Sequence, residues 1–253
     1  MTDGAQVVER TARLLRALSA DSGEPMTTTR LAQATGLTRP TAHRLLTALA
    51  EQGFVDREPG GAAWVLGPEL YVMGALAADR YDITGTAAEA VRAVAVATGE
   101  SAFLSARRGD ETVCLLREEG AFPLRSHVLH EGIRFPLGVA SAGLAILAML
   151  PERDREDYLR RVDLVPAWGA AHAAGPLRER LARARADGYV VNPGLIVEGS
   201  WGMAAAIFDA HGRPAWALSA TGVEQRFDDE RRPLIGRVLV EQAHVVTQRL
   251  RGR

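Results

Sequence analysis

The sequence predicts an α+β protein of two domains, and three observations lead to that prediction. The chain has 253 residues, which is enough for one large domain or two ordinary ones. Its first quarter has mostly helical periodicity and ends in a short hairpin. The remainder alternates helical segments with pairs of strands that favour an antiparallel sheet. We therefore expect a domain over residues 1–67, a linker helix over 68–83 and a second domain over 84–253.

The composition limits the kind of protein. Hydrophobic residues make up 47% and charged residues 24%, as is usual for globular chains. The formal net charge is -1, so any basic surface must be local. A single cysteine, Cys114, excludes an intrachain disulfide framework and fits a reducing compartment. Without a signal-peptide core or a run of about 18 apolar residues, we expect a cytoplasmic protein with no membrane span.

The first domain begins with two predicted helices. Residues 5–20 place apolar side chains at helical spacing, and the stretch 21–25 breaks that pattern. A short helix follows, which Thr27 or Thr28 can cap and Gly36 can end. The residues that we expect to face inward from it are Leu31, Ala32 and Ala34.

A third helix starts only three residues later. Thr38 is the expected N-cap, and Pro40 falls in the first turn, where its missing N–H costs no hydrogen bond. Gly53 is expected to end the helix. Its buried stripe is predicted to be Ala42, Leu45, Leu46 and Leu49. Strand-like runs at 54–55 and 64–66, around glycines and a proline at 59–61, then predict a hairpin.

The second domain is expected to open with a helix over 86–99 and a hairpin that turns at residues 109–110. A strand and loop follow, then a short apolar helix near 140–150 and a polar helical region over 151–187. Three further strands are predicted, the last two joined by a turn at 209–214, and a terminal helix completes the chain.

The stretch GLTRPTAHRLLTAL (36–49) indicates a helix-turn-helix for DNA. No acidic residue occurs between Glu24 and Glu51. Carboxylates are repelled by phosphate, whereas arginine can bind phosphate or guanine from a helix in the major groove. The expected DNA-contacting residues are Thr28, Arg30, Arg39, Thr41, His43, Arg44 and Thr47, with Arg57 from the hairpin. The alternative is a small helical bundle with a solvated arginine face.

Two groups of segments resemble one family. LAQATGLTRPTAHRLLTALAEQGFVDRE and WVLGPELYVMG resemble the winged helix-turn-helix of the IclR (isocitrate lyase regulator) family of bacterial transcription regulators. FPLGVASAGLAILAMLP and RADGYVVNPGLIVEGSWGMAAAIFDAHGRPAWALSATG resemble its effector-binding domain. The resemblance covers nearly the whole chain. It implies a GAF-like second domain, a dimer or tetramer, and control of catabolic operons; we expect a repressor, with activation left open.

The stretch GVASAG (138–143) raises a competing enzyme hypothesis. A serine between glycines can form a nucleophile elbow, but Gly138 stands three residues before Ser141 instead of two. No histidine has an acid that can be placed beside it, and no metal-binding spacing occurs. We therefore expect no enzyme, no metal and no cofactor. Small residues that open a helix instead favour the binding of a carboxylate by backbone N–H groups.

By the resemblance, this helix start forms part of the effector pocket. The residues implied are Gly138, Ala140, Ser141, Ala142, Gly143, Asn192, Trp201, Gly202, Met203, Ser219 and Thr221. The last two are two residues apart and so share one face of a strand. Arg125 and His127, alternate residues of a strand-like segment, either pair with an anionic effector or form a solvated edge.

The chain departs from the family pattern in its pocket. Leu144, Gly202 and Ala206 stand where lysine, cysteine and proline are frequent, and Asn192 replaces an acid. These changes favour an aromatic or otherwise apolar carboxylate beside Trp201 and Met203, unless those two belong to the core. The apolar residues expected to support an oligomer are Val7, Leu14, Leu18, Leu70, Val72, Met73 and Leu76.

Overall fold

The computed structural model describes the whole chain except residues 1–2, 20–23, 59, 82, 125–127 and 253. The chain divides into two compact units, Met1–Asp82 and Ile83–Arg253. The helix expected over 68–83 is observed as α4 (Pro68–Tyr81), and it counts with the first unit. None of the described helices is long and apolar enough to cross a membrane.

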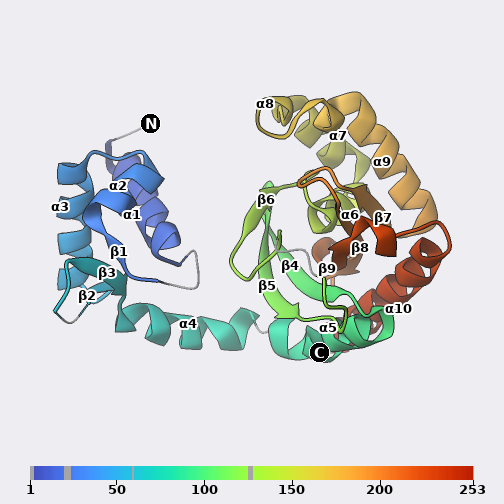
Figure 1. Cartoon of the computed structure of the whole chain (residues 1–253), viewed down its shortest axis with the longest axis horizontal. Helices are drawn as coiled ribbons and strands as arrows, with labels where there is room; N and C mark the ends of the chain where they lie inside the picture. The colour runs from blue at the N-terminus through green and yellow to red at the C-terminus, as the bar shows by residue number, and fades with distance from the viewer. Residues whose placement is uncertain (1–2, 20–23, 59, 82, 125–127, 253) are drawn as a thin grey trace. The chain divides into compact units, whose positions relative to one another are not determined.

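The first unit is a helical domain with a small sheet. Its elements are α1 (Asp3–Ser19), β1 (Met26–Thr27), α2 (Thr28–Thr35), α3 (Arg39–Glu51), β2 (Val55–Arg57), β3 (Ala63–Leu66) and α4 (Figure 1). The predicted hairpin is confirmed, because β2 and β3 pair antiparallel. Strand β1 pairs with the other edge of β3. It was not predicted, since two residues carry no detectable alternation.

The core of the first unit lies between α1, α2, α3 and the sheet. Its buried apolar residues are Leu14, Leu18, Leu31, Ala32, Ala42, Leu46, Leu49, Val55 and Trp64. Leu45 is only half-buried. Ala34, expected to face inward, is exposed, and Thr35 is buried instead. The reason is that the inward face of α2 follows Thr28, Leu31, Ala32 and Thr35, the helical spacing counted from its true start.

The second unit is built on one antiparallel sheet with strand order β6-β5-β4-β9-β8-β7. Its strands are β4 (Ser101–Arg108), β5 (Glu111–Glu118), β6 (Arg134–Pro136), β7 (Val190–Pro193), β8 (Ser200–Phe208) and β9 (Pro214–Val223). The helical segments are α5 (Ile83–Thr98), α6 (Ser141–Met149), α7 (Glu152–Arg161), α8 (Val165–Trp168), η2 (Ala170–His172), α9 (Ala174–Asp187), η3 (Glu224–Arg226) and α10 (Arg231–Arg251). The predicted hairpin turns at 109–110 and 209–214 are confirmed.

Two separate cores cover the two faces of this sheet. One contains α6 with side chains from α7 and α9, and the other contains α5 and α10, as Figure 1 lets the reader follow. Successive residues of a strand contribute to opposite cores: Ala204 belongs to the α6 side and Ala205 to the α10 side. The predicted α+β class with a largely antiparallel sheet is therefore confirmed.

Candidate functional site

The helix pair α2–α3 is fixed by its caps. The Thr27 hydroxyl accepts a hydrogen bond from the Arg30 N–H at 3.3 Å, and Gly36 ends α2 in the left-handed region with φ +65°. Thr38 caps α3 as predicted, accepting from the Thr41 N–H at 3.4 Å. The connection between the helices is therefore three residues, 36–38. Such a short turn sets the two helices as a helix-turn-helix requires.

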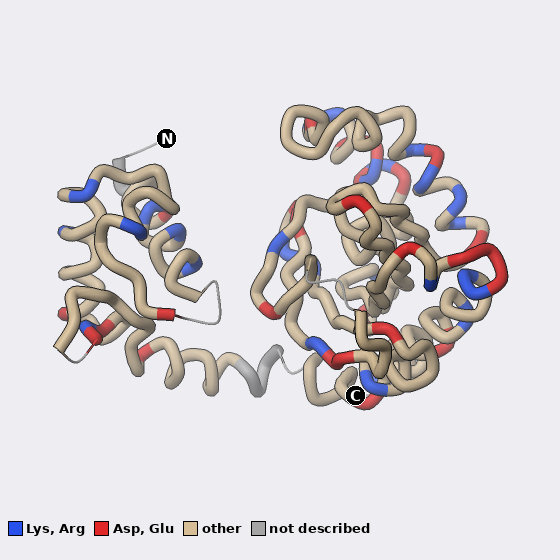
Figure 2. The backbone as a smooth tube through the Cα atoms, in the orientation of Figure 1, with Lys and Arg blue, Asp and Glu red and all other residues tan. Residues whose placement is uncertain are grey.

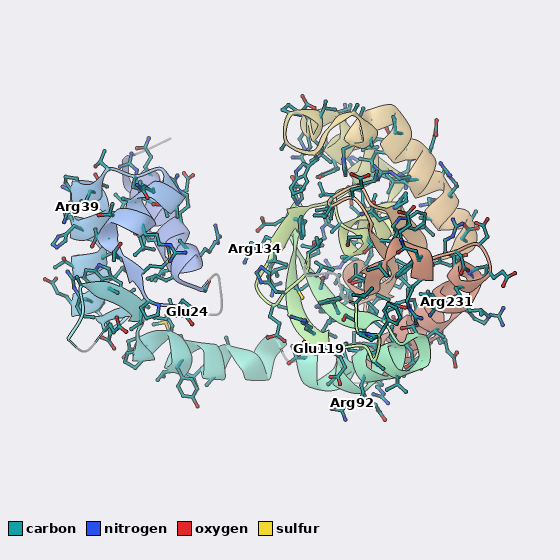
Figure 3. The ribbon with its side chains drawn as sticks, viewed as in Figure 1. Glu24, Arg39, Arg92, Glu119, Arg134 and Arg231 are labelled. Atoms are coloured by element: carbon teal, nitrogen blue, oxygen red, sulfur yellow. The ribbon has the colours of Figure 1, made fainter. Side chains whose placement is uncertain are left out.

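The face of α3 turned away from the core is basic. Arg39, His43, Arg44 and Thr47 are exposed, and Thr41 is half-buried. Figure 3 shows Arg39 extending outward from this helix, and in Figure 2 the charges along α3 are arginines until Glu51. The ion pairs formed within the described residues do not include the three arginines of the helix pair, Arg30, Arg39 and Arg44. Their guanidinium groups are thus available to a polyanion.

Thr28 and Arg57, from the expected DNA-contacting set, are held by contacts with Trp64. Thr28 is buried, and its hydroxyl accepts a hydrogen bond from the Trp64 indole N–H at 2.9 Å. We therefore remove Thr28 from that set. The Arg57 guanidinium lies 3.7 Å from the centre of the Trp64 ring and donates to the Ala62 carbonyl at 3.0 Å. It stays exposed, so it both stiffens the hairpin and presents charge.

In the second unit, the backbone of the segment before α6 packs closely against α9. Gly138 has φ +88°, a conformation that disfavours side chains, and a Cβ there would lie 3.1 Å from Leu177. Ala140 caps α6 without any side-chain hydrogen bond. The first-turn N–H groups of Ser141, Ala142 and Gly143 have no acceptor within their own helix. This helix end therefore offers donors and a positive partial charge to a bound anion.

The strands below α6 bring three predicted residues into one row. Asn192 is paired with Gly202, and Gly202 with Thr221, across β7, β8 and β9. A Cβ on Gly202 would lie 3.0 Å from the Ser141 Oγ and 3.2 Å from the Thr221 Cγ2. The absence of a side chain at Gly202 is what lets Ser141 lie directly over the strand. Ser219, two residues from Thr221, faces the same side.

Two hydroxyls at this site are buried without a partner. Neither the Ser219 Oγ nor the Thr221 Oγ1 has a hydrogen bond, although Ser219 is 0% and Thr221 7% exposed. By contrast, two other buried hydroxyls of this unit donate to their own helices, Thr98 to the Val94 carbonyl at 2.7 Å and Thr247 to the Ala243 carbonyl at 2.9 Å. Because an unpaired buried hydroxyl is costly, an exception of this kind calls for an explanation such as a ligand.

Two residues beside this row, Arg180 and His172, were not predicted from the sequence. The Asn192 side chain donates to the Val139 carbonyl at 3.0 Å and accepts from the Arg180 guanidinium at 3.4 Å. His172 is buried, its Nδ1 lies 2.8 Å from the Trp168 carbonyl, and its Nε2 has no partner. Desolvation lowers the pKa of His172 below its ordinary value. No periodicity could single out these residues, because a 3-10 turn and a separate helix bring them here.

The expectation that Trp201 and Met203 line the same pocket is wrong. Met203 is fully buried in the core formed with α5 and α10, and Trp201 packs against that core. Both lie across the sheet from Gly202, because consecutive residues of a strand point to opposite faces. Leu144 and Ala206 belong to the α6 core. The predicted Arg125 and His127 lie outside the described residues.

The described side chains give little support for a metal site or a reactive thiol. They include no group of three or more His, Cys, Asp or Glu residues that could hold a metal ion. Cys114 is buried, and desolvation raises the pKa of its thiol to about 12, which keeps it protonated at neutral pH.

Comparisons with known proteins agree over both units. Protein-family profiles described as "Bacterial transcriptional regulator IclR C-terminal" and "IclR helix-turn-helix domain" match residues 75–248 and 7–59. The chain is 28% identical to the transcriptional repressor IclR of Escherichia coli, covering 97% of this chain and 90% of that one. It is 26% identical to the regulator KipR of Bacillus subtilis, covering 89% and 90%.

Solved structures give the same result. An IclR transcriptional regulator from Alicyclobacillus acidocaldarius has a TM-score of 0.79 at 26% identity, covering 96% of this chain and 98% of that one. An IclR homologue from Microbacterium hydrocarbonoxydans, solved in complex with 4-hydroxybenzoate, has a TM-score of 0.78 at 24% identity and covers 98% and 100%. These relatives share the order of the two units.

Proposed function

The chain belongs to the IclR family of bacterial transcription regulators, and on that premise we propose that it is a repressor controlled by a small organic carboxylate. Its relatives are regulators and not enzymes. The observation that carries the effector part of the proposal is the pair of buried hydroxyls without partners, Ser219 and Thr221, beside the first turn of α6.

On the DNA side, α3 enters the major groove. Arg39 and Arg44 meet base edges or phosphates there, and Thr47 adds a hydroxyl of the kind that contacts either. Arg30 on α2 and Arg57 on the hairpin lie on flanking phosphates. The support for this arrangement is the exposed basic face of α3, which carries no ion pair within the described residues.

On the effector side, the carboxylate accepts hydrogen bonds from the N–H groups at the start of α6. The hydroxyls of Ser219 and Thr221 then donate to it or to a second polar group. The ligand's body is apolar, because Phe103 is directly paired with Ser219 in the sheet and Leu137 precedes α6 in the same core. The 4-hydroxybenzoate in the Microbacterium relative supports this ligand class.

The repressor is at least a dimer, assembled through the first unit. Exposed apolar side chains lie along α4. Tyr71 is 80% and Leu76 74% exposed, and Val72 and Met73 between them are half-exposed. Leu14 and Leu18, expected on this surface, belong instead to the core of the unit. A dimer presents two copies of α3 to a pseudo-palindromic operator, with a tetramer as the larger alternative.

Calorimetry and gel shifts together test the proposal. Wild-type protein is expected to bind 4-hydroxybenzoate more tightly than glyoxylate, and the Ser219→Ala/Thr221→Val variant to bind it weakly. The same acid should change operator affinity in the wild type and not in the variant, because a ligand shifts an equilibrium only through unequal affinity for its two states. Equal binding by both proteins would place the effector elsewhere. Tighter binding of glyoxylate would refute the apolar body.

A further inference from the structure

A cavity of about 430 Å³ lies at the β7 edge of the second unit's sheet, between α9 and the start of α10. Its walls include Arg180, Arg183, Tyr189, Val191, Trp201 and Arg232. Small-molecule sites typically measure about 300–1,000 Å³ and combine apolar walls with a few polar groups. We propose that this cavity binds a small organic anion, at a site separate from the one beside α6.

The two sites are separated by the alternation of the strands. Val191 and Trp201 line the cavity and pack against the core formed with α5 and α10. Their neighbours Asn192 and Gly202 belong to the row beneath α6. A ligand in the cavity therefore contacts residues that a ligand beside α6 does not reach, with Arg180 as the residue that touches both surroundings.

The charges of the cavity favour an anion. Three arginines, Arg180, Arg183 and Arg232, line it together with two aspartates, Asp187 and Asp229, and Arg183 is paired at 3.9 Å with Glu179, which lies outside the lining. Arg232 is ion-paired with Asp229. No ion pair within the described residues involves Arg180. Arg180 is thus the lining arginine that has no ion-pair partner among the described residues, whereas Arg183 and Arg232 each have one.

Arg180 is poorly satisfied by its present contacts. One terminal nitrogen donates to the Ala171 carbonyl at 2.9 Å, the other only weakly to Asn192 at 3.4 Å, and its Nε is buried without an acceptor. Burial and the neighbouring Arg183 lower the pKa of Arg180. A half-buried guanidinium with no counter-charge is destabilising, and a bound carboxylate would supply both the charge and the missing acceptor.

The remaining walls select an anion with an apolar, planar body. The Tyr189 ring is held against α10 at Gly236, where an added Cβ would lie 2.5 Å from that ring. Trp201 forms a second aromatic wall, with the Arg232 guanidinium 5.5 Å from its ring centre. Two fixed aromatic side chains give apolar contact area at little entropic cost. A benzoate-like acid combines the charge and the flat body that these walls accommodate.

Because Arg180 also donates to Asn192, the two sites are expected to influence each other. Asn192 holds the Val139 carbonyl just before α6, so an anion that draws Arg180 away alters the support of that helix start. This consequence rests on the proposed effector site, whereas binding in the cavity does not. Coupling between two binding sites must be reciprocal, so each ligand should change the affinity for the other by the same factor.

Benzoate binding to the full-length chain tests the cavity. Calorimetry is expected to give two benzoate ions per wild-type chain, and one for Ser219→Ala/Thr221→Val, which keeps the cavity intact. Adding Arg180→Gln to that variant should weaken the remaining binding about 10- to 100-fold, the size of a lost charge-assisted pair. Arg178→Gln is the matched control, because Arg178 lies on the same helix but pairs with Glu156 outside the cavity.

Tryptophan fluorescence gives a second measurement that does not depend on the folding of an Arg180 variant. In Ser219→Ala/Thr221→Val protein, benzoate should change the emission, Trp201→Phe should abolish that change, and neutral benzamide should not produce it. Complete loss of benzoate binding in the Ser219/Thr221 variant would overturn the cavity site and leave the effector proposal standing. Two ions bound to that variant would refute the effector site and support the cavity. Equal benzoate affinity with and without Arg180→Gln would also overturn the cavity site.

Discussion

The exposed face of α3 and the buried row beneath α6 place functional groups in opposite environments. Arg39 and Arg44 extend into solvent, where an unpaired guanidinium is hydrated and costs the fold little. Ser219 and Thr221 hold their hydroxyls unpaired inside the second unit, where each costs about 1–3 kcal/mol. The first unit can therefore change its DNA contacts without losing stability, whereas under the proposed function the second unit gives up stability to keep a polar site ready for a ligand.

The largest effect is expected on the exposed face. Replacing Arg39 and Arg44 with alanine should reduce operator affinity by roughly 2–6 kcal/mol, since each good arginine contact is worth about 1–3 kcal/mol. The free energy of unfolding should change by less than about 0.5 kcal/mol, as for other surface substitutions. Gel shifts and urea melts measure the two quantities. Unchanged binding to all DNA would remove α3 as the recognition helix, and a large loss of stability would break the comparison.

Replacing Arg44 alone tests whether this side chain contacts a base or a phosphate. If Arg44 contacts a base, Arg44→Ala lowers specific affinity by about 1–3 kcal/mol and leaves non-specific binding nearly unchanged. If it contacts phosphate, both affinities fall together and the salt dependence becomes shallower. A gel-shift series at several salt concentrations separates the two outcomes.

Assembly should also depend on the first unit and not on the second. Leu76→Asp places a charge on the exposed apolar face of α4, where Leu76 is 74% exposed in the single chain. Light scattering at micromolar concentration should find a dimer for the wild type and a monomer for this variant. Val96→Asp is the matched control, because Val96 is 79% exposed on α5 of the second unit. A monomeric wild type, or an equal loss of assembly in both variants, would contradict the assignment.

Removing the unpaired hydroxyls of the buried row should stabilise the ligand-free protein, although it weakens effector binding. Ser219→Ala with Thr221→Val removes both unpaired hydroxyls, each worth about 1–3 kcal/mol, so the free energy of unfolding of the ligand-free protein should rise by about 2–6 kcal/mol. Thr98→Val, the same change at a paired hydroxyl, should instead destabilise by at least about 1 kcal/mol, because the bond to the Val94 carbonyl and the bond from the Glu100 N–H are both lost. Urea unfolding without ligand compares the signs. A destabilised Ser219/Thr221 variant would mean that these hydroxyls are satisfied in solution.

The two regions also differ in how far the sequence could predict them. Gly36 ends α2 and Thr38 caps α3, so the start of α3 and its helical period define which side chains reach solvent, and the basic face follows from the sequence. Thr28 was misjudged because two threonines could cap α2. The structure uses Thr27, which turns the Thr28 side chain inward to Trp64.

In the second unit, only part of the site follows from strand alternation. It correctly puts Ser219 and Thr221 on one face, and the same rule would have separated Gly202 from Trp201 and Met203. Trp201, Gly202 and Met203 were assigned to one pocket because they lie in one contiguous segment that resembles the family, and that assignment ignored the alternation of the strand. Arg180 and His172 could not be predicted, because tertiary packing alone brings α9 and a 3-10 turn to β7.

A pair of neighbouring residues tests the separation of the two faces. Gly202→Ala puts a methyl group 3.0 Å from the Ser141 Oγ, so it should weaken effector binding by about 1 kcal/mol or more. Met203→Leu conserves volume in the opposite core and should leave effector affinity unchanged, at a stability cost below about 1.5 kcal/mol. Calorimetry with 4-hydroxybenzoate measures both. Equal losses would mean that one pocket spans both residues.

The smallest effect concerns protonation beside the buried row. Burial holds the pKa of His172 below its ordinary value of about 6.5, while in the unfolded chain that value is restored. Between the two pKa values the unfolded chain binds more protons, so the wild type loses stability as pH falls below about 6.5.

His172→Asn keeps a donor toward the Trp168 carbonyl and removes the titration. Between pH 7 and 5.5, the free energy of unfolding measured by urea melts should therefore fall less steeply with decreasing pH in the variant than in the wild type. The difference in slope should be at most about 1.4 kcal/mol per pH unit. The other five histidines are present in both proteins, so the difference between the curves reports His172 alone. Parallel curves would mean that His172 is hydrated in solution, and that the region beneath α6 is less sealed from water than the contrast with α3 requires.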